Sequence, residues 1–381
     1  MKILFFQNDL NPSSGGIARV SCSLGRYFVK QGHDVYFMYY LSDYDEIDSH
    51  RKCKYVFTMD EKLMYSQIED YLEQVGGVDV VIVQALFFSP VRKALVRLRE
   101  QYHFKIIACL HSNPKGLIPT KAKGVYAMLK DYGRRFLGRT VQNVMRAMYK
   151  ESDCFVLLSA SFEKEMSACF HINANKGYVA IANPLTYNQF ATSVDISNKE
   201  KVVLIVSRLH ESQKNIKSAL RIWKKLEDSG LILGWTLRLA GYGDDEKELL
   251  DYANFLKLRQ FVFLGRTNNP LPLYQKASLF MMTSRFEGFG ITLTESLQNG
   301  VVPIAFNSFS AVQDILEEGV NGFLIKPFDE DAYAEKLLYL MTNKDRREKM
   351  AIAGVERAKR FSIENIGKEW EKLFQRTNQE A

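Results

Sequence analysis

The first half of the chain alternates short apolar runs with stretches in which apolar residues recur at helical spacing. After the first run, Val20, Leu24 and Phe28 share one face of a predicted helix, which Gly32 ends. Short apolar runs bounded by polar segments are typical of buried strands. The predicted strands are Lys2–Phe6, Asp34–Tyr40, Val78–Gln84, Lys105–Leu110 and Phe155–Leu158. Strands that alternate with helices in this way predict a parallel sheet.

The second half repeats the same alternation. Its predicted strands are Lys201–Val206, Trp235–Ala240, Phe261–Leu264, Leu279–Thr283, Val301–Phe306 and Phe323–Ile325. The clearest helices between them are Asn215–Asp228, Ile291–Gln298 and Asp331–Met341. We therefore expect a second parallel sheet, and the 381 residues are enough for two domains of ordinary size.

A polar, unpatterned segment separates the two halves. It predicts an N-terminal domain over residues 1–184, a linker over 185–199 and a C-terminal domain over 200–362. The fold class is α/β, with two doubly wound, Rossmann-like domains that face each other across a cleft. Ligands of open α/β sheets bind beyond the carboxyl ends of the strands. The loops that follow strands are therefore where we expect the chemistry.

Charge and composition narrow the class of protein. No run of 18 apolar residues predicts a membrane-spanning helix, and five widely spaced cysteines predict reduced thiols in a cytoplasmic protein. The net charge is +7, and residues 115–150 hold nine lysines and arginines but one acid, interleaved with apolar residues. Such a stretch suits peripheral contact with an anionic membrane, for example the cytoplasmic face of an inner membrane. A solvated helix pair with a core-facing stripe explains the pattern equally well.

Two loops carry candidate anion-binding groups. Gly15 and Gly16 follow the first strand and open a helix, whose N-terminal amides attract an anion. Arg208 and Lys214 follow the first strand of the second half, near the start of another helix. An arginine and a lysine at that edge can neutralise a diphosphate. A simple turn and two solvated cations are the alternative interpretations.

The strongest local signal is the loop between the strand Leu279–Thr283 and the helix that follows it. Gly288 and Gly290 free the backbone to bend beside the amides that start the helix. Glu287 and Glu295 are eight residues apart, and their carboxylates can accept hydrogen bonds from sugar hydroxyls. The pattern of strand, Gly-x-Gly loop and helix indicates a phosphate and sugar site.

His111 ends the strand Lys105–Leu110 and is expected at the same kind of edge. The histidines and cysteines show no metal-ligand spacing, so no metal is expected. The sequence Gly241-Tyr242-Gly243 lacks the third glycine of a dinucleotide fingerprint, which argues against hydride transfer.

Taken in order along the chain, these motifs resemble the GT-B fold retaining glycosyltransferases of family 4, which are typical of bacterial polysaccharide and lipopolysaccharide synthesis. The resemblance covers essentially the whole chain. The residues that carry it are Gly15 to Val20, Gly32-His33, His111, Asn183-Pro184, Ser207-Arg208-Leu209, Lys214-Asn215, Gly241-Tyr242-Gly243, Leu264-Gly265-Arg266 and the Glu287–Glu295 pair. The departures are Ser207 in place of a usual glycine, and one extra residue between Arg208 and Lys214.

The resemblance implies roles for individual residues. Gly16 is expected against the phosphates and sugar of the donor, and His111 near the anomeric carbon. Arg208 and Lys214 would hold the diphosphate, Glu287 the transferred sugar and Glu295 the ribose. The backbone amides expected to face phosphate and sugar are those of Gly288, Phe289, Gly290 and Ile291. Gly241 is also expected in the donor site, and Arg266 is expected at the nucleobase. The C-terminal helix, 363–381, is expected to return to the first domain.

The sequence therefore predicts a metal-independent, retaining hexosyltransferase without a cofactor. The donor would be a nucleotide-diphosphate sugar, and the acceptor a saccharide or a lipid-linked saccharide. One alternative is a sugar-nucleotide 2-epimerase of the same fold, which would convert the donor without an acceptor. Another is a non-catalytic protein that binds nucleotide sugars or nucleic acid. The nucleic-acid alternative lacks the expected aromatic platform, so no nucleic-acid partner is predicted.

Overall fold

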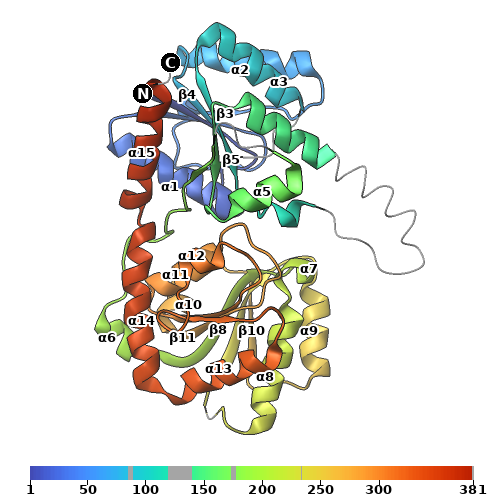
Figure 1. Ribbon diagram of the computed structural model, residues 1–381, viewed down its shortest axis with the longest axis vertical. Coiled ribbons are helices and arrows are strands. Elements are labelled where there is room, and N and C mark those ends of the chain that lie inside the picture. The colour runs from blue at the N-terminus through green and yellow to red at the C-terminus, as the bar shows by residue number, and fades with distance from the viewer. Residues whose placement is uncertain (85–88, 119–139, 173–176, 233, 380–381) are drawn as a thin grey trace, which may run out of the picture. The chain divides into compact units, whose positions relative to one another are not determined.

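The computed structural model describes residues 1–84, 89–118, 140–172, 177–232 and 234–379. They form two compact units, which are drawn in Figure 1. Unit 1 comprises Met1–Pro184 and Ile363–Ala381, and unit 2 comprises Leu185–Ser362.

Unit 1 is built on a parallel sheet with the strand order β3-β2-β1-β4-β5-β6-β7. The strands are β1 (Lys2–Phe6), β2 (Asp34–Tyr39), β3 (Lys52–Lys54), β4 (Val80–Val83), β5 (Lys105–Leu110), β6 (Cys154–Leu157) and β7 (Val179–Ala180). The central strands are buried and apolar, as strands covered on both faces must be. The chain leaves β1 toward β2 and later continues from β4 in the opposite direction. The sheet therefore has its topological switch point between β1 and β4, where ligands of such sheets bind.

The helices of unit 1 cover both faces of this sheet (Figure 1). They are α1 (Gly16–Lys30), α2 (Glu61–Val75), α3 (Ser89–Tyr102), α5 (Phe162–Phe170), α15 (Ile363–Gln379), a helix over 140–151, and short 3-10 turns at Ser49–Arg51 and Lys115–Leu117. The C-terminal helix α15 packs on α1: the rings of Phe28 and Phe374 are 5.2 Å apart, and His33 Nε2 lies 3.1 Å from a carboxylate oxygen of Glu371. These contacts make α15 part of unit 1.

Unit 2 is built on a second parallel sheet with the strand order β10-β9-β8-β11-β12-β13. Its strands are β8 (Glu200–Arg208), β9 (Thr236–Tyr242), β10 (Phe261–Gly265), β11 (Ala277–Met282), β12 (Val302–Phe306) and β13 (Phe323–Ile325). The switch point lies between β8 and β11. Arg208 ends β8, and the segments that follow β8 and β11 contain Lys214 and Glu287.

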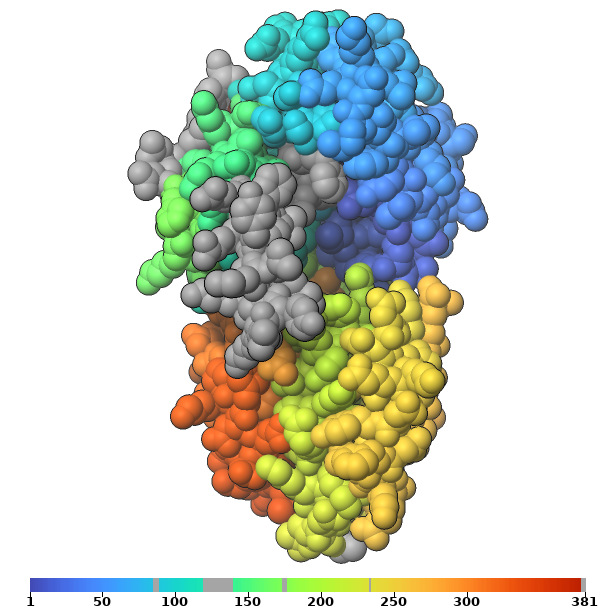
Figure 2. Space-filling model, turned by 90° about the vertical axis from the view of Figure 1, so that its right-hand side faces the viewer, coloured from blue at the N-terminus to red at the C-terminus, as the bar shows by residue number. Residues whose placement is uncertain are grey.

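Helices also cover both faces of the second sheet. They are α6 (Ser193–Ser197), α7 (Glu211–Lys214), α8 (Ile216–Ser229), α9 (Glu246–Phe255), α10 (Leu271–Lys276), α11 (Ile291–Gln298), α12 (Val312–Ile315), α13 (Glu330–Thr342), α14 (Lys344–Ala358) and the 3-10 turn Lys359–Phe361. In Figure 1, α8 and α9 lie on one side of the sheet and α11 and α14 on the other. Trp223 and Tyr333 are fully buried in the core between the helices and the sheet. The edge strand β10 and helix α9 reach the surface, in the yellow region of Figure 2.

The predicted α/β class with two doubly wound, parallel-sheet domains is confirmed. The segment 185–199, which we expected to be a linker, is counted in unit 2 and contains α6. Of the basic stretch 115–150, residues 119–139 lie outside the described residues. The helix over 140–151 buries Met145, Met148 and Tyr149, which is what a core-facing stripe predicts. Within the described residues, no helix is both long and apolar enough to cross a membrane.

Candidate functional site

The loops after β8 and β11 in unit 2 converge on an ion pair. Lys214 Nζ lies 2.6 Å from Glu287 Oε1. Both side chains are largely buried, with 17% of Lys214 and 10% of Glu287 exposed. An ion pair withdrawn from water to this extent is costly unless further hydrogen bonds complete it. Its location at the switch point of the sheet makes it the first candidate for chemistry.

Two neutral side chains complete the hydrogen bonding of Glu287. Ser284 donates its hydroxyl proton to Glu287 Oε1 at 2.6 Å, and the amide of Gln213 reaches Glu287 Oε2 at 3.4 Å. The same Gln213 amide donates to the carbonyl of Phe286 at 3.2 Å. The carboxylate is therefore oriented by three donors, and its position is fixed before any ligand arrives.

The two loops are bonded to each other by backbone as well as side-chain groups. The Arg285 amide donates to the Gln213 carbonyl at 2.7 Å, and Thr283 Oγ1 donates to the Lys214 carbonyl at 3.1 Å. Asn215, in the left-handed conformation at φ 52°, donates to the Thr283 carbonyl at 3.2 Å and accepts from Arg285 at 2.7 Å. Asparagine tolerates this conformation better than most residues. The turn at Asn215 thus holds Lys214 against Glu287.

Gly290 stands at the N-cap of α11 with φ 100°, a conformation that favours glycine. It has no side chain with which to cap the helix, and α11 begins immediately after it, at Ile291. The first amides of a helix are available to an anion when no side chain caps them. The predicted anion-binding character of Gly288, Phe289, Gly290 and Ile291 is compatible with this geometry and stays a prediction.

Glu295 has a different environment from Glu287. It is 1% exposed, and its carboxylate accepts hydrogen bonds from Thr186 Oγ1 at 2.6 Å and from the Tyr274 hydroxyl at 3.0 Å. These are neutral partners, whereas Glu287 has a cation. The expected contact of Glu295 with a ribose stays a prediction, and it requires a ligand to reach a carboxylate that the protein already holds.

Three further predicted residues lie at the carboxyl ends of β8, β9 and β10. Arg208 is the last residue of β8, is exposed, and stands in register with Tyr242. The guanidinium of Arg266 lies 4.5 Å from the centre of the Tyr242 ring. A Cβ atom on Gly241 would lie 1.9 Å from the Ser207 carbonyl oxygen. Close packing against the β8 backbone is therefore a reason for glycine at position 241 that is independent of any role in donor binding.

In unit 1, the predicted glycine loop leads directly into α1. Gly15 is the N-cap of α1 and Gly16 is its first residue, and no side chain caps the helix. The preceding loop is held by Asn11, whose side-chain oxygen accepts from the Ser13 amide at 2.9 Å and whose carbonyl accepts from Ser14 Oγ at 2.7 Å. An uncapped helix start is the arrangement expected of an anion site.

His111 follows β5 in unit 1, at the same edge of the sheet as the glycine loop. Its Nε2 is hydrogen-bonded to Oε1 of Gln84, the residue that follows β4. Burial lowers the pKa of His111 to about 4, so the imidazole is neutral at physiological pH. A neutral imidazole can accept a hydrogen bond but cannot supply a positive charge to a leaving phosphate.

The groups that orient the predicted residues were not predicted from the sequence. Ser284, Gln213 and Gln84 each touch a predicted residue, but none of the three was assigned a role from the sequence. Ser284 lies after β11, three residues before Glu287, and Gln213 lies after β8, one residue before Lys214. Their place in those segments was the available signal. Gln84 closes a predicted strand, where a polar residue is common for other reasons.

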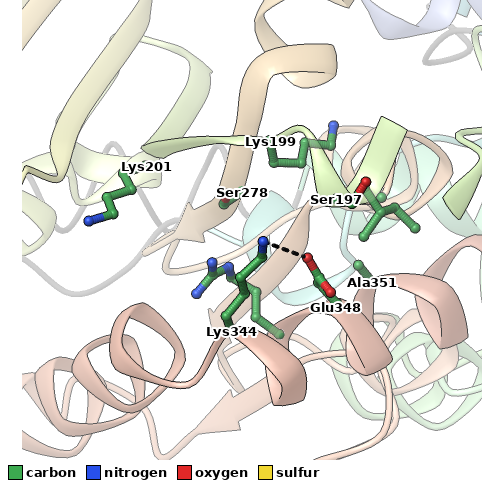
Figure 3. A pocket seen from close by; sticks show the side chains of 10 residues that line it. Ser197, Lys199, Lys201, Ser278, Lys344, Glu348 and Ala351 are labelled. Atoms are coloured by element: carbon green, nitrogen blue, oxygen red, sulfur yellow. Dashed lines mark ion pairs between the residues drawn. The ribbon is translucent and has the colours of Figure 1, made fainter. Parts of the chain in front are cut away.

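A small pocket in unit 2 lies away from these residues (Figure 3). Its volume is about 140 Å³, and its lining includes Lys199, Ser278 and Lys344. Lys199 and Ser278 stand near the amino ends of β8 and β11, opposite the loops described above. Lys199 donates to the carbonyls of Tyr274 and Gln275 at 2.7 and 2.9 Å, and Lys344 faces Glu348 at 3.6 Å. The pocket is therefore distinct from the candidate site.

Replacing Ser284 with alanine tests whether the orientation of Glu287 matters. Ser284 is 4% exposed and donates directly to the carboxylate. If Glu287 acts in the site, S284A is expected to lower kcat/KM for the natural reaction about tenfold, the effect of losing one hydrogen bond to a charged group. Ser308 is a matched control because its hydroxyl donates to the Ser284 carbonyl at 2.6 Å and not to Glu287. Equal losses in S284A and S308A would contradict the prediction.

Both units of the chain match models of known protein families. The model of the family described as Glycosyl transferases group 1 matches residues 188–357. The model of the family described as Glycosyltransferase Family 4 matches residues 14–180. The first match contains all the candidate residues of unit 2, and the second contains Gly15, Gly16 and His111.

Individual relatives agree with the family models. An uncharacterized glycosyltransferase of Haemophilus influenzae is 24% identical over 378 residues, which cover 98% of this chain and 99% of the relative. The GalNAc-alpha-(1->4)-GalNAc-alpha-(1->3)-diNAcBac-PP-undecaprenol alpha-1,4-N-acetyl-D-galactosaminyltransferase of Campylobacter jejuni is 28% identical over 197 residues, 51% of this chain and 53% of that protein. The crystal structure of Anabaena Alr3699/HepE in complex with UDP and glucose superimposes with a TM-score of 0.75 at 17% identity, over 98% of this chain and 99% of that chain. That likeness concerns the fold.

Proposed function

Because this chain belongs to the GT-B glycosyltransferases of family 4, we propose that it transfers a sugar from a nucleotide-diphosphate sugar to a saccharide or lipid-linked saccharide, with retention of anomeric configuration. The observation that carries the proposal is the buried Lys214–Glu287 pair at the switch point of unit 2. A carboxylate held by a lysine, a serine and a glutamine is suited to receive sugar hydroxyls. Lys214 in this pair and Arg208 at the end of β8 are suited to hold a diphosphate.

The proposed mechanism breaks the bond between the anomeric carbon and the diphosphate through an oxocarbenium-like transition state. Negative charge develops on the departing diphosphate, where Lys214, Arg208 and the amides that start α11 stabilise it. Glu287 binds hydroxyls of the transferred sugar and fixes the position of Lys214. The acceptor hydroxyl approaches on the face that the nucleotide leaves, and the departing phosphate takes its proton. In this scheme the cations do the work that a metal ion would otherwise do.

The relatives support the proposed classes of substrate. The name of the Campylobacter relative includes a lipid-linked saccharide, and the Anabaena structure contains UDP and glucose. We extend these classes to this chain: a nucleotide-diphosphate sugar as donor, and an acceptor used in the synthesis of cell-surface polysaccharide or lipopolysaccharide. Peripheral contact with an anionic membrane belongs to the same proposal.

A panel of nucleotide diphosphates and nucleotide sugars tests the proposal. A donor that binds the folded protein raises its melting temperature by mass action. At a ligand concentration 100 times its Kd, the expected stabilisation is about 2.7 kcal/mol. Transfer is then measured with the stabilising donor and a set of lipid-linked and free saccharides, and the anomeric configuration of the product is read by NMR.

Two outcomes would overturn the proposal. Conversion of the donor sugar to an epimer in the absence of any acceptor would indicate an isomerase. A protein that is stabilised by none of the nucleotides and transfers no sugar would not be a nucleotide-sugar-dependent transferase. Inverted configuration in the product would refute the retaining mechanism while leaving sugar transfer intact.

A further inference from the structure

Three polar side chains, two buried glutamines and a partly buried histidine, form a row at the carboxyl edge of the unit 1 sheet. Gln7 follows β1, Gln84 follows β4 and His111 follows β5, and these strands are neighbours in the sheet. Phe6 pairs with Val83 and Val83 with Ala108, so the alternation of side chains puts Gln7, Gln84 and His111 on one face. The row lies at the switch point of this sheet.

Each member of the row has a buried polar atom without a hydrogen-bond partner among the described residues: Gln7 Oε1, Gln84 Nε2 and His111 Nδ1. The exposed fractions of Gln7 and Gln84 are 0% and 1%. Most buried polar atoms in folded proteins are hydrogen-bonded, so three such atoms in neighbouring strands need an explanation. Leaving atoms of this kind unpaired is unfavourable unless a ligand or an ordered water completes them.

The bond between Gln84 and His111 determines which ring nitrogen carries the proton. An amide oxygen can only accept a hydrogen bond, so the imidazole nitrogen that faces Gln84 Oε1 must donate. In a neutral imidazole the other nitrogen is then an acceptor. That nitrogen, Nδ1, is the atom without a partner. If the side-chain amide of Gln84 were flipped by 180°, its nitrogen would face His111 and impose the opposite tautomer. Measuring the tautomer distinguishes the two orientations.

We propose that Gln84 is a positioning residue for His111, fixing the tautomer with the proton on Nε2 so that Nδ1 accepts a hydrogen bond from a saccharide hydroxyl. The proposal rests on the proposed function for the identity of the ligand, but not for the tautomer. The hydroxyl belongs either to the donor sugar or to the acceptor. Gln84 itself touches His111 and is not assigned a contact with the reacting atoms.

The tautomer is measured directly on the full-length protein labelled with ¹⁵N-histidine. The chain has six histidines, and the His111 signals are assigned by their loss in H111Q. The expected result is a protonated Nε2 and an unprotonated Nδ1 at pH 7. In Q84M, which keeps the length of the side chain but has no acceptor, His111 is expected to populate both tautomers. Gln7 provides the matched control: Q7M removes a buried amide from the same row, and the tautomer of His111 is expected to stay unchanged.

Activity provides the second readout. With the donor and acceptor found above, Q84M is expected to lower kcat/KM about tenfold, the factor that losing one oriented hydrogen bond produces. A larger KM for the nucleotide sugar assigns the hydroxyl to the donor, and a larger KM for the saccharide assigns it to the acceptor. Q84E is expected to add an acidic limb to the pH profile. A carboxylate beside His111 raises the pKa of the imidazole, and protonation of Nδ1 on lowering the pH removes the acceptor.

Several results would overturn the proposal. The opposite tautomer in the wild-type protein would do so, whether or not the protein transfers sugar. A tautomer unchanged in Q84M would show that Gln84 does not fix it. Unchanged kcat, KM and pH profile in both Q84M and Q84E would remove the functional part. A failure of the proposed function alone would leave the NMR result standing, so the two are separable.

Discussion

Replacing Glu287 with glutamine is expected to lower kcat/KM for sugar transfer by about a hundredfold while nucleotide diphosphate binding is retained. Glutamine keeps the shape of the side chain and one acceptor oxygen, so Ser284 can still donate to it. It loses the negative charge that holds Lys214 at 2.6 Å. Transfer rates with saturating acceptor, and Kd for the nucleotide diphosphate by calorimetry, measure the two effects separately. A folded E287Q variant with full transfer activity would refute the role assigned to Glu287.

The same substitution has a consequence for stability. Lys214 is 17% exposed, so E287Q leaves a largely buried cation without its partner. Breaking a buried pair by removing one member costs about 3–5 kcal/mol, whereas replacing both members with neutral residues of similar size costs much less. The double variant K214M/E287Q is therefore expected to be more stable than E287Q and at least as inactive. Activity that recovered together with stability would show that the pair serves only the fold.

A second ion pair of unit 2 provides the control for this experiment. Arg221 Nη2 lies 2.5 Å from Glu330 Oε1, and the side chain of Glu330 is 18% exposed. This pair joins α8 to α13, and neither of its residues lies in the segments after β8 and β11 that carry Lys214 and Glu287. E330Q is expected to lower the melting temperature without a selective loss of transfer. A comparable loss of kcat/KM in E330Q would indicate that any weakened pair in unit 2 reduces activity.

Sequence periodicity predicted the architecture because most strands here are buried on both faces. A strand such as β5 is an unbroken apolar run, and its predicted bounds, Lys105–Leu110, are those observed. Two strands were missed for a physical reason. The edge strand β3, Lys52–Lys54, has no apolar run, and β7 is two residues long. Backbone pairing with a neighbouring strand defines them, and a single sequence does not display that pairing.

Helix α14 shows the same limit for helices. It spans Lys344–Ala358 and carries many charged residues, and its buried side chains, such as Met350 and Val355, form a narrow stripe. The stripe packs against α11 and the sheet, so tertiary contact stabilises this helix more than its own pattern does. By contrast, the C-terminal helix has a clear pattern of its own: Ile366, Trp370 and Phe374 recur at a spacing of four, and all three are buried in α15.

For the candidate site, sequence predicted the residues that carry charge but not those that orient them. Lys214 and Glu287 are 73 residues apart, and they meet because β8 and β11 are neighbours in the sheet. A correct prediction of the strand order is therefore enough to predict that these two side chains lie close together. The partners of Glu295, Thr186 and Tyr274, come from two other segments and depend on side-chain packing. The same holds for the bond between Gln84 and His111. Such contacts follow from the three-dimensional arrangement and have no local signature.

Gly241 was predicted to bind the donor, and the structure provides a different reason for its glycine. It pairs with Ser207 across β8 and β9, and a Cβ atom there would lie 1.9 Å from the Ser207 carbonyl oxygen and 3.3 Å from a methyl group of Leu209. A carbonyl oxygen in a strand ladder cannot move without breaking the pairing around it. The close approach of the two backbones therefore requires a residue without a side chain.

Replacing Gly241 with alanine is expected to destabilise unit 2 by about 3 kcal/mol, since the clash with Ser207 can be relieved only by separating β8 from β9. Chemical denaturation measures the free energy of unfolding.

Gly265, which has φ 69° and no atom within 4 Å of a Cβ position, is the control: G265A carries backbone strain alone and is expected to cost about 1 kcal/mol. If G241A were as stable as the wild type but bound the nucleotide sugar poorly, the packing explanation would be wrong and the donor-binding role would stand. Because β8 ends at Arg208, the packing explanation predicts a third result: the remaining folded G241A protein loses affinity for nucleotide diphosphates through displacement of Arg208, without any need for a contact between Gly241 and the ligand.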